Sequence, residues 1–190
     1  MFTEQLKIDE KLVADILTNE LNELNELNEL NELDWPREIL GDFDTYLARQ
    51  SLYLDVDLPE VEDTPNRTAV FGACNRRLLI KEKSNRQRRE EYAQHIHGAV
   101  SRLAGVMFGL LPAIERVVIS GYSQRLDPAT GHINDEYLLS VAIGKKRFAE
   151  LNFEQLEQVD LIASLERFDL RREMTKTGIF RPVEPIELLA

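Results

Sequence analysis

Residues 84–112 read SNRQRREEYAQHIHGAVSRLAGVMFGLLP, and their apolar side chains recur at steps of three and four residues. This spacing places one apolar stripe along a helix. Ser84, followed three residues later by Gln87, has the form of a capping box, which satisfies exposed N–H groups where a helix begins. Pro112 ends the pattern. The sequence therefore predicts one long central helix over residues 85–111.

Strand patterns stand on both sides of this helix. Apolar and polar side chains alternate over residues 52–58, which is typical of a half-buried strand. Four other runs are rich in β-branched, aromatic or leucine residues and are expected to pair as two hairpins: residues 68–72 with 77–81, and residues 116–122 with 136–143. Turn sequences at Cys74-Asn75 and from Asp127 to Gly131 join the members of each pair.

Two further helices and a tail complete the chain. Ile39, Leu40, Phe43, Tyr46 and Leu47 have helical spacing and predict a helix that begins near Pro36. Leu156, Val159, Ile162, Leu165 and Phe168 predict another helix around residues 156–173. Gly178, Pro182 and Pro185 disfavour regular structure after it, so we expect the tail to lie extended across the domain.

The N-terminal part contains five identical Asn-Glu-Leu repeats over residues 19–33, with leucines at Leu21, Leu24, Leu27, Leu30 and Leu33. Residues 8–33 are expected to be helical. A period of three drifts by about 60° per repeat on a helix, so the leucines wind around the axis. Two interpretations stay open: a spacer without a dedicated role, or a helix that docks a partner or a second copy through these leucines.

Charge is distributed unevenly along the chain. The net charge is −11, but residues 1–65 hold 18 acids and 4 bases, and residues 66–190 hold 16 acids and 19 bases. The acidity therefore belongs to the front third. Together these patterns predict an α+β protein in which a central long helix packs on a small antiparallel sheet. An acidic helical arm over residues 1–34 precedes a globular domain over residues 35–190 with an extended C-terminal tail.

Composition also limits the cofactors and the compartment. Cys74 is the single cysteine, which excludes an internal disulfide and a CxxC zinc site. No run of 18 apolar residues occurs, and the N-terminus lacks the pattern of a secretory signal. We therefore expect a cytoplasmic protein with no membrane partner, no cofactor and no structural metal.

The densest charged segment, residues 76–89, holds seven bases against one acid: Arg76, Arg77, Lys81, Lys83, Arg86, Arg88 and Arg89. Such a block can neutralise several phosphates. The same bases are also suited to pairing with the acidic arm, or to forming a solvated face. The sequence leaves nucleic-acid binding and these alternatives open.

Catalytic motifs are poorly represented. A magnesium-dependent nuclease of the restriction-endonuclease type needs an acid two residues before a lysine, but Ile143 precedes Lys145 at that distance. His95 and His97 are turned about 200° apart on a helix and are not expected to share a metal ion. A hydrolase that uses Glu91 and His95 is the weakest hypothesis.

The sequence thus predicts a non-enzymatic interaction protein. The leading hypothesis is protein association, with a partner or a second copy, through the leucines of the N-terminal arm. The alternative is a nucleic-acid-binding domain that uses the block 76–89 on a degenerate nuclease-like scaffold.

Overall fold

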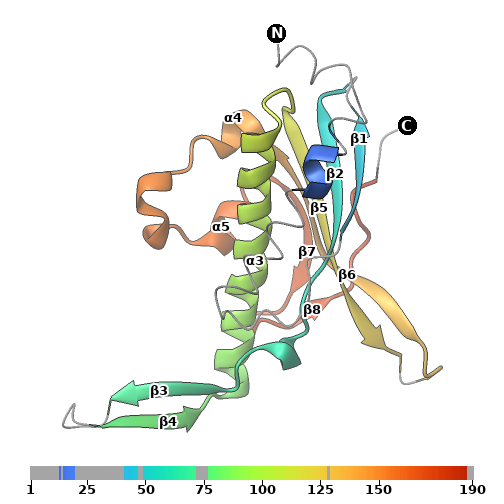
Figure 1. The fold of residues 1–190 in the computed structure, drawn as a ribbon. Coiled ribbons are helices and arrows are strands. Elements are labelled where there is room, and N and C mark those ends of the chain that lie inside the picture. The colour runs from blue at the N-terminus through green and yellow to red at the C-terminus, as the bar shows by residue number, and fades with distance from the viewer. Residues whose placement is uncertain are drawn as a thin grey trace.

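The computed structural model describes residues 13, 15–19, 41–46, 49–71, 77–127 and 129–187. Within these ranges the chain forms a six-stranded sheet, the long helix α3 (Asn85–Leu110) across one face of it, and a separate two-stranded hairpin (Figure 1). The sheet has the order β1-β2-β5-β6-β7-β8. Its strands are β1 (Gly41–Tyr46), β2 (Ser51–Asp57), β5 (Arg116–Leu126), β6 (Ile133–Gly144), β7 (Asp169–Met174) and β8 (Phe180–Arg181).

One strand pair differs from the others in direction. β2 and β5 run parallel, while the remaining neighbours in the sheet are antiparallel. A parallel pair needs a long crossover connection. Here the crossover contains the separate hairpin, formed by β3 (Arg67–Phe71) and β4 (Leu78–Glu82), and then α3. This topology attaches the small hairpin beside the first turn of the long helix.

Side-chain alternation gives the sheet two different faces. One row runs through Phe43, Leu54, Ile119, Val141 and Leu170, and these apolar side chains belong to the main core beneath α3. The neighbouring row runs through Asp42, Asp55, Ser120, Ser140 and Arg171 and lies on the opposite face. The sheet therefore joins an apolar interior to a polar back face.

Helix α3 closes the apolar face. Ile96, Val100 and Met107 are fully buried in the main core, and the hydroxyl of Ser84 accepts a hydrogen bond from the N–H of Gln87 where the helix begins. The predicted central helix is confirmed within one residue. The predicted strand at 52–58 and the predicted hairpin of 116–122 with 136–143 are confirmed as β2 and as β5–β6.

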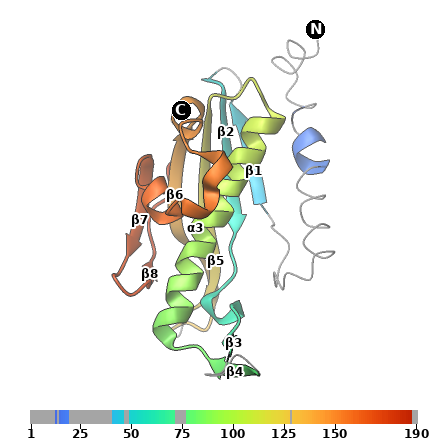
Figure 2. The ribbon, with the colours of Figure 1, turned by 90° about the vertical axis from the view of Figure 1, so that its left-hand side faces the viewer.

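Short helical segments connect the larger elements: η2 (Val61–Asp63), α4 (Lys145–Phe148), η3 (Phe153–Gln158) and α5 (Leu161–Leu165). Figure 2 shows α5 crossing the front of α3, on the side of the helix away from the sheet. Leu165 is fully buried there, and the Phe148 ring lies 5.6 Å from the Phe108 ring. These segments cover the outer side of the helix.

The C-terminal residues lie on the back face of the sheet. The N–H of Val183 donates to the carbonyl of Tyr137 at 2.9 Å, and the N–H of Ile186 donates to the hydroxyl of Ser140 at 3.0 Å. Ile186 packs with Val118 and Ala142 in a small second cluster. The polar back face is thus partly covered by the end of the chain.

The predicted fold class is wrong. We expected one central helix on a small antiparallel sheet, whereas the principal sheet has six strands and mixed directions, and a two-stranded sheet stands apart from it. The difference arises from two segments that were predicted to be helical and instead add strands to the sheet.

The first of these segments is residues 39–47. Its described part, Gly41–Tyr46, is strand β1, in which Asp42 and Asp44 are exposed and Phe43 packs against the core. Alternation of acids with Phe43 suits a strand at the end of a sheet. The helical spacing of the apolar residues was a weaker signal than this alternation.

The second segment is residues 156–173. The carboxylate of Asp160 accepts hydrogen bonds from the N–H groups of Ile162 and Ala163, and so begins the new short helix α5. The chain then turns into β7, whose side chains alternate between exposed and half-buried positions. A cap inside the apolar pattern therefore divides the predicted helix.

Part of the N-terminal segment packs on the main core. Residues 15–19 are helical, and Val13 and Leu17 are almost completely buried among the core residues. The rest of the predicted helix at 8–33, including all five repeat leucines, lies outside the described residues. Among the described helices, none is both long and apolar enough to cross a membrane.

Candidate functional site

The β3–β4 hairpin projects away from the body of the protein (Figure 1). Its strands pair antiparallel, with Phe71 opposite Leu78 and Ala69 opposite Ile80, which confirms the predicted small hairpin. The connecting residues 72–76 lie outside the described residues. No described strand pairs with the outer edge of either strand, so both edges of the hairpin are open within the described part of the chain.

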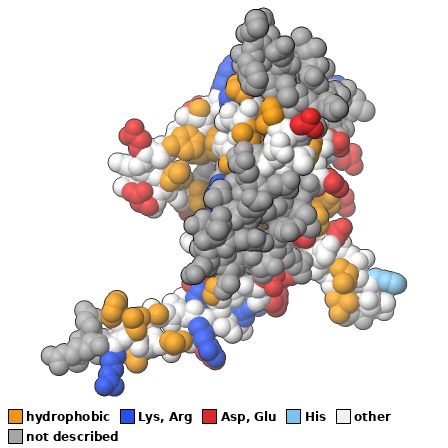
Figure 3. Space-filling model, in the orientation of Figure 1, with side chains coloured by type: hydrophobic (Ala, Val, Ile, Leu, Met, Phe, Trp, Pro, Cys, Tyr) orange, Lys and Arg blue, Asp and Glu red, His pale blue; other side chains and the backbone are white. Residues whose placement is uncertain are grey.

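Large apolar side chains are exposed on this hairpin. The exposed fractions are 67% for Phe71, 61% for Leu78, 45% for Leu79 and 73% for Ile80. Figure 3 shows hydrophobic side chains along the projecting hairpin, with basic side chains beside them. A contiguous exposed apolar surface of this kind marks an interaction site more often than a solvated face.

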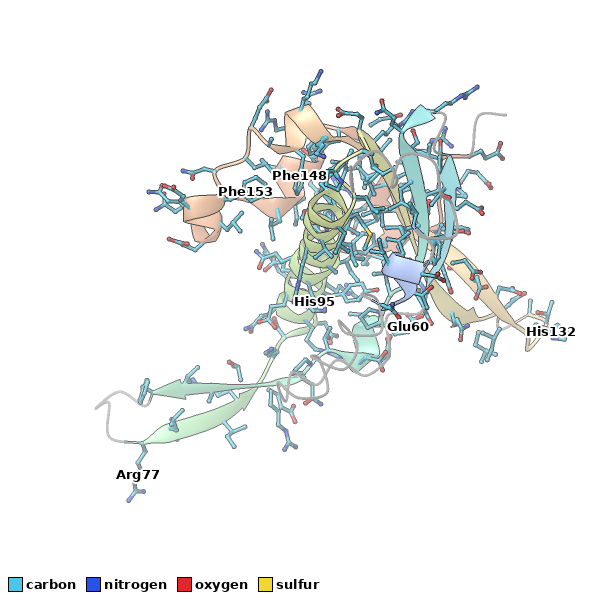
Figure 4. The ribbon with its side chains drawn as sticks, turned by 45° about the horizontal axis from the view of Figure 1, so that its top comes forward. Glu60, Arg77, His95, His132, Phe148 and Phe153 are labelled. Atoms are coloured by element: carbon cyan, nitrogen blue, oxygen red, sulfur yellow. The ribbon has the colours of Figure 1, made fainter. Side chains whose placement is uncertain are left out.

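The basic block 76–89 is divided between the hairpin and the start of α3. Arg77 and Lys81 are exposed on the hairpin, and no described carboxylate forms an ion pair with either of them. Arg77 points away from the body (Figure 4). Arg76 lies outside the described residues. Lys81 shares one face of β4 with Leu79, because side chains two residues apart in a strand lie on the same face, and Arg77 directly precedes the strand.

The bases nearer to α3 have partners within the protein. Lys83 pairs with Glu91, and Arg86 pairs with Glu90 at 2.8 Å. The guanidinium of Arg88 donates to the carbonyl of Val61 at 3.0 Å. Among the described bases of the block, Lys83, Arg86 and Arg88 are therefore engaged within the protein, whereas Arg77 and Lys81 on the hairpin form no ion pair with a described carboxylate.

A hollow of about 160 Å³ opens on the polar back face of the sheet. Asp42 and Asp44 of β1, Asp55 of β2 and Glu187 of the C-terminal segment bring four acids to it, and no basic residue lines it. Its apolar and aromatic lining includes Tyr53, Tyr137, Pro185 and Ile186. The hollow therefore combines acidic side chains with apolar and aromatic ones.

Hydrogen bonds fix the inner wall of the hollow. The phenol of Tyr137 donates to the Asp55 carboxylate at 3.3 Å, and the hydroxyls of Ser120 and Ser140 lie 2.8 Å apart. Burial raises the pKa of Asp55, and the charges of Asp42 and Asp44 raise it further, against the hydrogen bond from Tyr137. The negative charges of Asp42 and Asp44 oppose the ionisation of Asp55, and a bound cation would relieve this repulsion.

A second group of charges lies between the roots of the two hairpins. Arg125 lies 3.3 Å from Glu136 and 3.8 Å from Glu60, and the phenol of Tyr92 donates to the carbonyl of Pro59 at 2.8 Å. Burial raises the pKa of Glu60, and the charge of Arg125 opposes this rise. Figure 4 labels Glu60 in this region, near the lower half of α3. These contacts fix the segment that leads from β2 into β3.

Residue His97 forms a buried link between α3 and β7. One ring nitrogen, Nδ1, lies 2.6 Å from the carbonyl of Ala93, and the guanidinium of Arg172 donates to the other, Nε2, at 2.7 Å. Arg172 also pairs with Glu166. Burial lowers the pKa of His97, and the charge of Arg172 lowers it further, so the ring is neutral. Its contacts are those of a structural histidine.

The other residues considered for chemistry are separated or already engaged. Glu91 accepts hydrogen bonds from Lys83 and from Gln87, while His95 is exposed one turn away on α3 (Figure 4). His132 lies at the tip of the β5–β6 hairpin. Ile143, at the position where a nuclease needs an acid, is buried in the core. Within the described ranges, no group of three or more His, Cys, Asp or Glu residues is arranged to hold a metal ion.

Sequence reasoning identified the basic block but missed the acidic hollow. The hollow depends on Asp42 and Asp44 belonging to a strand that pairs with β2. The alternation of these acids with Phe43, just before the similar alternation in β2, is the signal from which it was predictable. The five repeat leucines, predicted to dock a partner, lie outside the described residues.

Comparison with protein-family models, with curated proteins and with solved structures finds no significant match for this chain.

Proposed function

We propose that this protein is a protein-association module that binds its partner through the β3–β4 hairpin. The observation that carries the proposal is the exposure of Phe71, Leu78 and Ile80 on a ribbon that stands clear of the main core. The sequence hypothesis of association through the repeat leucines remains a separate proposal. The hairpin supports a docking role because large apolar side chains on it are exposed.

Energetics favour a partner for this hairpin. Moving one large apolar side chain from water into an interface contributes roughly 1.5 to 3 kcal/mol. A two-stranded hairpin without a covering layer is marginally stable in water. A partner that binds the ordered hairpin would stabilise it by mass action. On binding, the hairpin would bury its apolar side chains and would be stabilised in its folded conformation.

Nucleic-acid binding through the same hairpin is the second candidate. A two-stranded ribbon fits the major groove, and Arg77 and Lys81 are exposed on it. However, Lys83, Arg86 and Arg88 already contact carboxylate or carbonyl oxygens. Affinity for duplex DNA depends on the number of phosphates neutralised, so few available bases favour protein association over this alternative.

Site-specific photocrosslinking tests the proposal. A photoreactive amino acid is placed at Ile80 in the full chain, and a control chain carries it at Leu156, which is also exposed but lies in η3. We expect one discrete crosslinked protein product from position 80 in cell extract, lost when Phe71→Ser is added. The same products from both positions, or a nucleic-acid adduct from position 80, would contradict the proposal.

A further inference from the structure

The two surfaces described above are complementary to each other. The hairpin carries exposed bases with apolar side chains, and the back-face hollow combines four acids with apolar and aromatic lining residues. The charges of the two surfaces are therefore opposite. We propose that the partner of the β3–β4 hairpin is a second copy of this chain, in which β4 adds to the open edge of β1. This inference rests on the proposed function and names its partner.

Both strands of the proposed joint, β1 and β4, have an open edge. β1 ends the strand order of the large sheet, and within the described part of the chain its outer edge pairs with no strand. β4 has an open edge as well. Two open strand edges present unpaired N–H and C=O groups that satisfy one another when the strands align. Addition of β4 would extend the six-stranded sheet across the boundary between the two copies.

Side-chain alternation in the two strands is complementary. In β4, Lys81 and Leu79 share one face, and Leu78 and Ile80 share the other, while Arg77 directly precedes the strand. In β1 the acids Asp42 and Asp44 share one face, and Phe43 lies on the other, against the core. A strand added beside β1 in the matching register therefore places Lys81 next to the acids and Leu78 and Ile80 next to Phe43.

The alternative register can be judged in the same way. A slip by one residue would turn Leu78 and Ile80 toward the acids and Lys81 toward the apolar face. This arrangement buries charge against apolar side chains and leaves the carboxylates without partners. The sequence of both strands thus favours the first register, in which Leu79 is the one apolar side chain of β4 on the acidic face.

The size and charge of the hollow suit one long basic side chain. Its volume of about 160 Å³ is comparable to the roughly 150 Å³ of a cavity that holds one benzene molecule, so it accommodates one long side chain. The side chain of Lys81, on the β4 face that would adjoin Asp42 and Asp44, has the charge that the hollow lacks. The ammonium group would meet Asp55 at the inner wall, where neighbouring acids already oppose its ionisation.

Reciprocity follows from the symmetry of the proposed contact. Each copy offers one hairpin and one β1 edge, so two copies related by a two-fold axis would form two identical joints and close as a dimer. Charge reversal tests this pattern, because one set of substitutions changes both joints at the same time.

The experiment measures self-association of the full chain by sedimentation velocity over a range of concentrations. One variant reverses the hairpin, Arg77→Glu with Lys81→Glu, and another reverses the acceptor, Asp42→Lys with Asp44→Lys. We expect the unaltered chain to dimerise and each variant alone to dimerise at least tenfold more weakly. Mixing the two variants restores the dimer, because both joints then bring opposite charges together. Asp42 and Asp44 are exposed, so the fold tolerates their replacement, which circular dichroism checks.

A matched control reverses two exposed bases elsewhere, Lys146→Glu with Lys176→Glu, and is expected to dimerise as the unaltered chain does. A monomer at all concentrations overturns the second-copy inference, while crosslinking from position 80 would still support the proposed function with another partner. Dimerisation of both reversed variants at the original strength, or no recovery on mixing, overturns the assigned joint. Loss of position-specific crosslinking would instead overturn the proposed function itself.

Discussion

The two hairpins β3–β4 and β5–β6 have similar local sequence but opposite surroundings. Both are antiparallel pairs built from β-branched, leucine and aromatic residues. In β5–β6, Ile119 and Val141 are completely buried between α3 and the neighbouring strands, whereas in β3–β4 Ile80 is 73% exposed. The difference teaches that strand propensity specifies a hairpin, and that only its neighbours decide whether its apolar side chains form a core or a docking surface.

The β5–β6 hairpin itself contains both conditions. Its inner half lies within the sheet, but at its outer end Leu126 and Ile133 face each other across the strands and are 65% and 67% exposed. Figure 1 shows this end extending past the sheet. Exposure therefore begins where the covering elements end, within one continuous pair of strands.

The largest expected effect separates the two hairpins by stability. Ile119→Ala removes a fully buried side chain from β5 and should reduce the free energy of unfolding by about 3 kcal/mol. Ile80→Ala in β4 should change it by less than about 0.5 kcal/mol, because little apolar surface is lost from the fold. Urea unfolding followed by circular dichroism, at a concentration where the chain is monomeric, measures both values. Similar losses at the two positions would show that Ile80 is buried in the folded chain.

A second prediction concerns how a hairpin is attached to α3. The turn between β7 and β8 contains Gly178, which has a φ of +75°, and a Cβ there would lie 2.8 Å from the carbonyl oxygen of Arg89. Gly178→Ala should destabilise the protein by about 2 kcal/mol through strain and steric overlap. The β7–β8 pair is thus held against α3 by a close backbone approach.

The matched control for this change is Gly109→Ala in α3. No atom lies within 4 Å of the position that its Cβ would take, and Gly109 is exposed. Alanine favours the helix over glycine by up to about 1 kcal/mol, so this variant should melt at the same or a higher temperature. A melting temperature for Gly178→Ala equal to that of the control would contradict the proposed close contact.

The comparison also explains how much of the structure was predictable. Helix α3 and strands β2, β5 and β6 were predicted because each has a long or strict pattern within its own residues. β1 and β7 were missed because their short apolar patterns also fit helices, and only pairing with distant strands decides between the two. The error changed the fold class, since both segments belong to the principal sheet.

The candidate site shows the same limit. The basic residues of 76–89 were evident from sequence, and the Arg86–Glu90 pair has a local signal in its i,i+4 spacing on the helix. The exposure of Lys81 and the pairing of Lys83 with Glu91 depend instead on how the hairpin meets the helix. The exposure of Ile80 was equally hidden, because an apolar residue in a strand is as compatible with a core as with an interface. The acidic hollow required β1 and could not be anticipated without it.

The smallest expected effect concerns the root of the β3–β4 hairpin, where Lys83 pairs with Glu91 of α3. Partial burial raises the pKa of Glu91, but hydrogen bonds from Lys83 and Gln87 together lower it below its usual value of 4.5. The carboxylate is therefore ionised at neutral pH and helps to hold the end of β4 against the helix. Glu91→Gln should weaken this attachment by roughly 0.5 to 1 kcal/mol, while leaving the main core intact.

Hydrogen exchange of the β4 amides tests this attachment locally. At pH 7 we expect protection in β4 to fall about two- to fivefold in Glu91→Gln, with β5 unchanged. A group whose folded pKa is lowered contributes stability above its unfolded pKa and loses it as the pH falls through the folded value. The difference between the two chains should therefore begin to shrink near pH 4.5 and disappear once the pH is below the lowered pKa of Glu91. Glu90→Gln, which removes only the exposed pair with Arg86, should leave β4 protection unchanged, and an equal loss in both variants would show that the Lys83 contact does not anchor the hairpin.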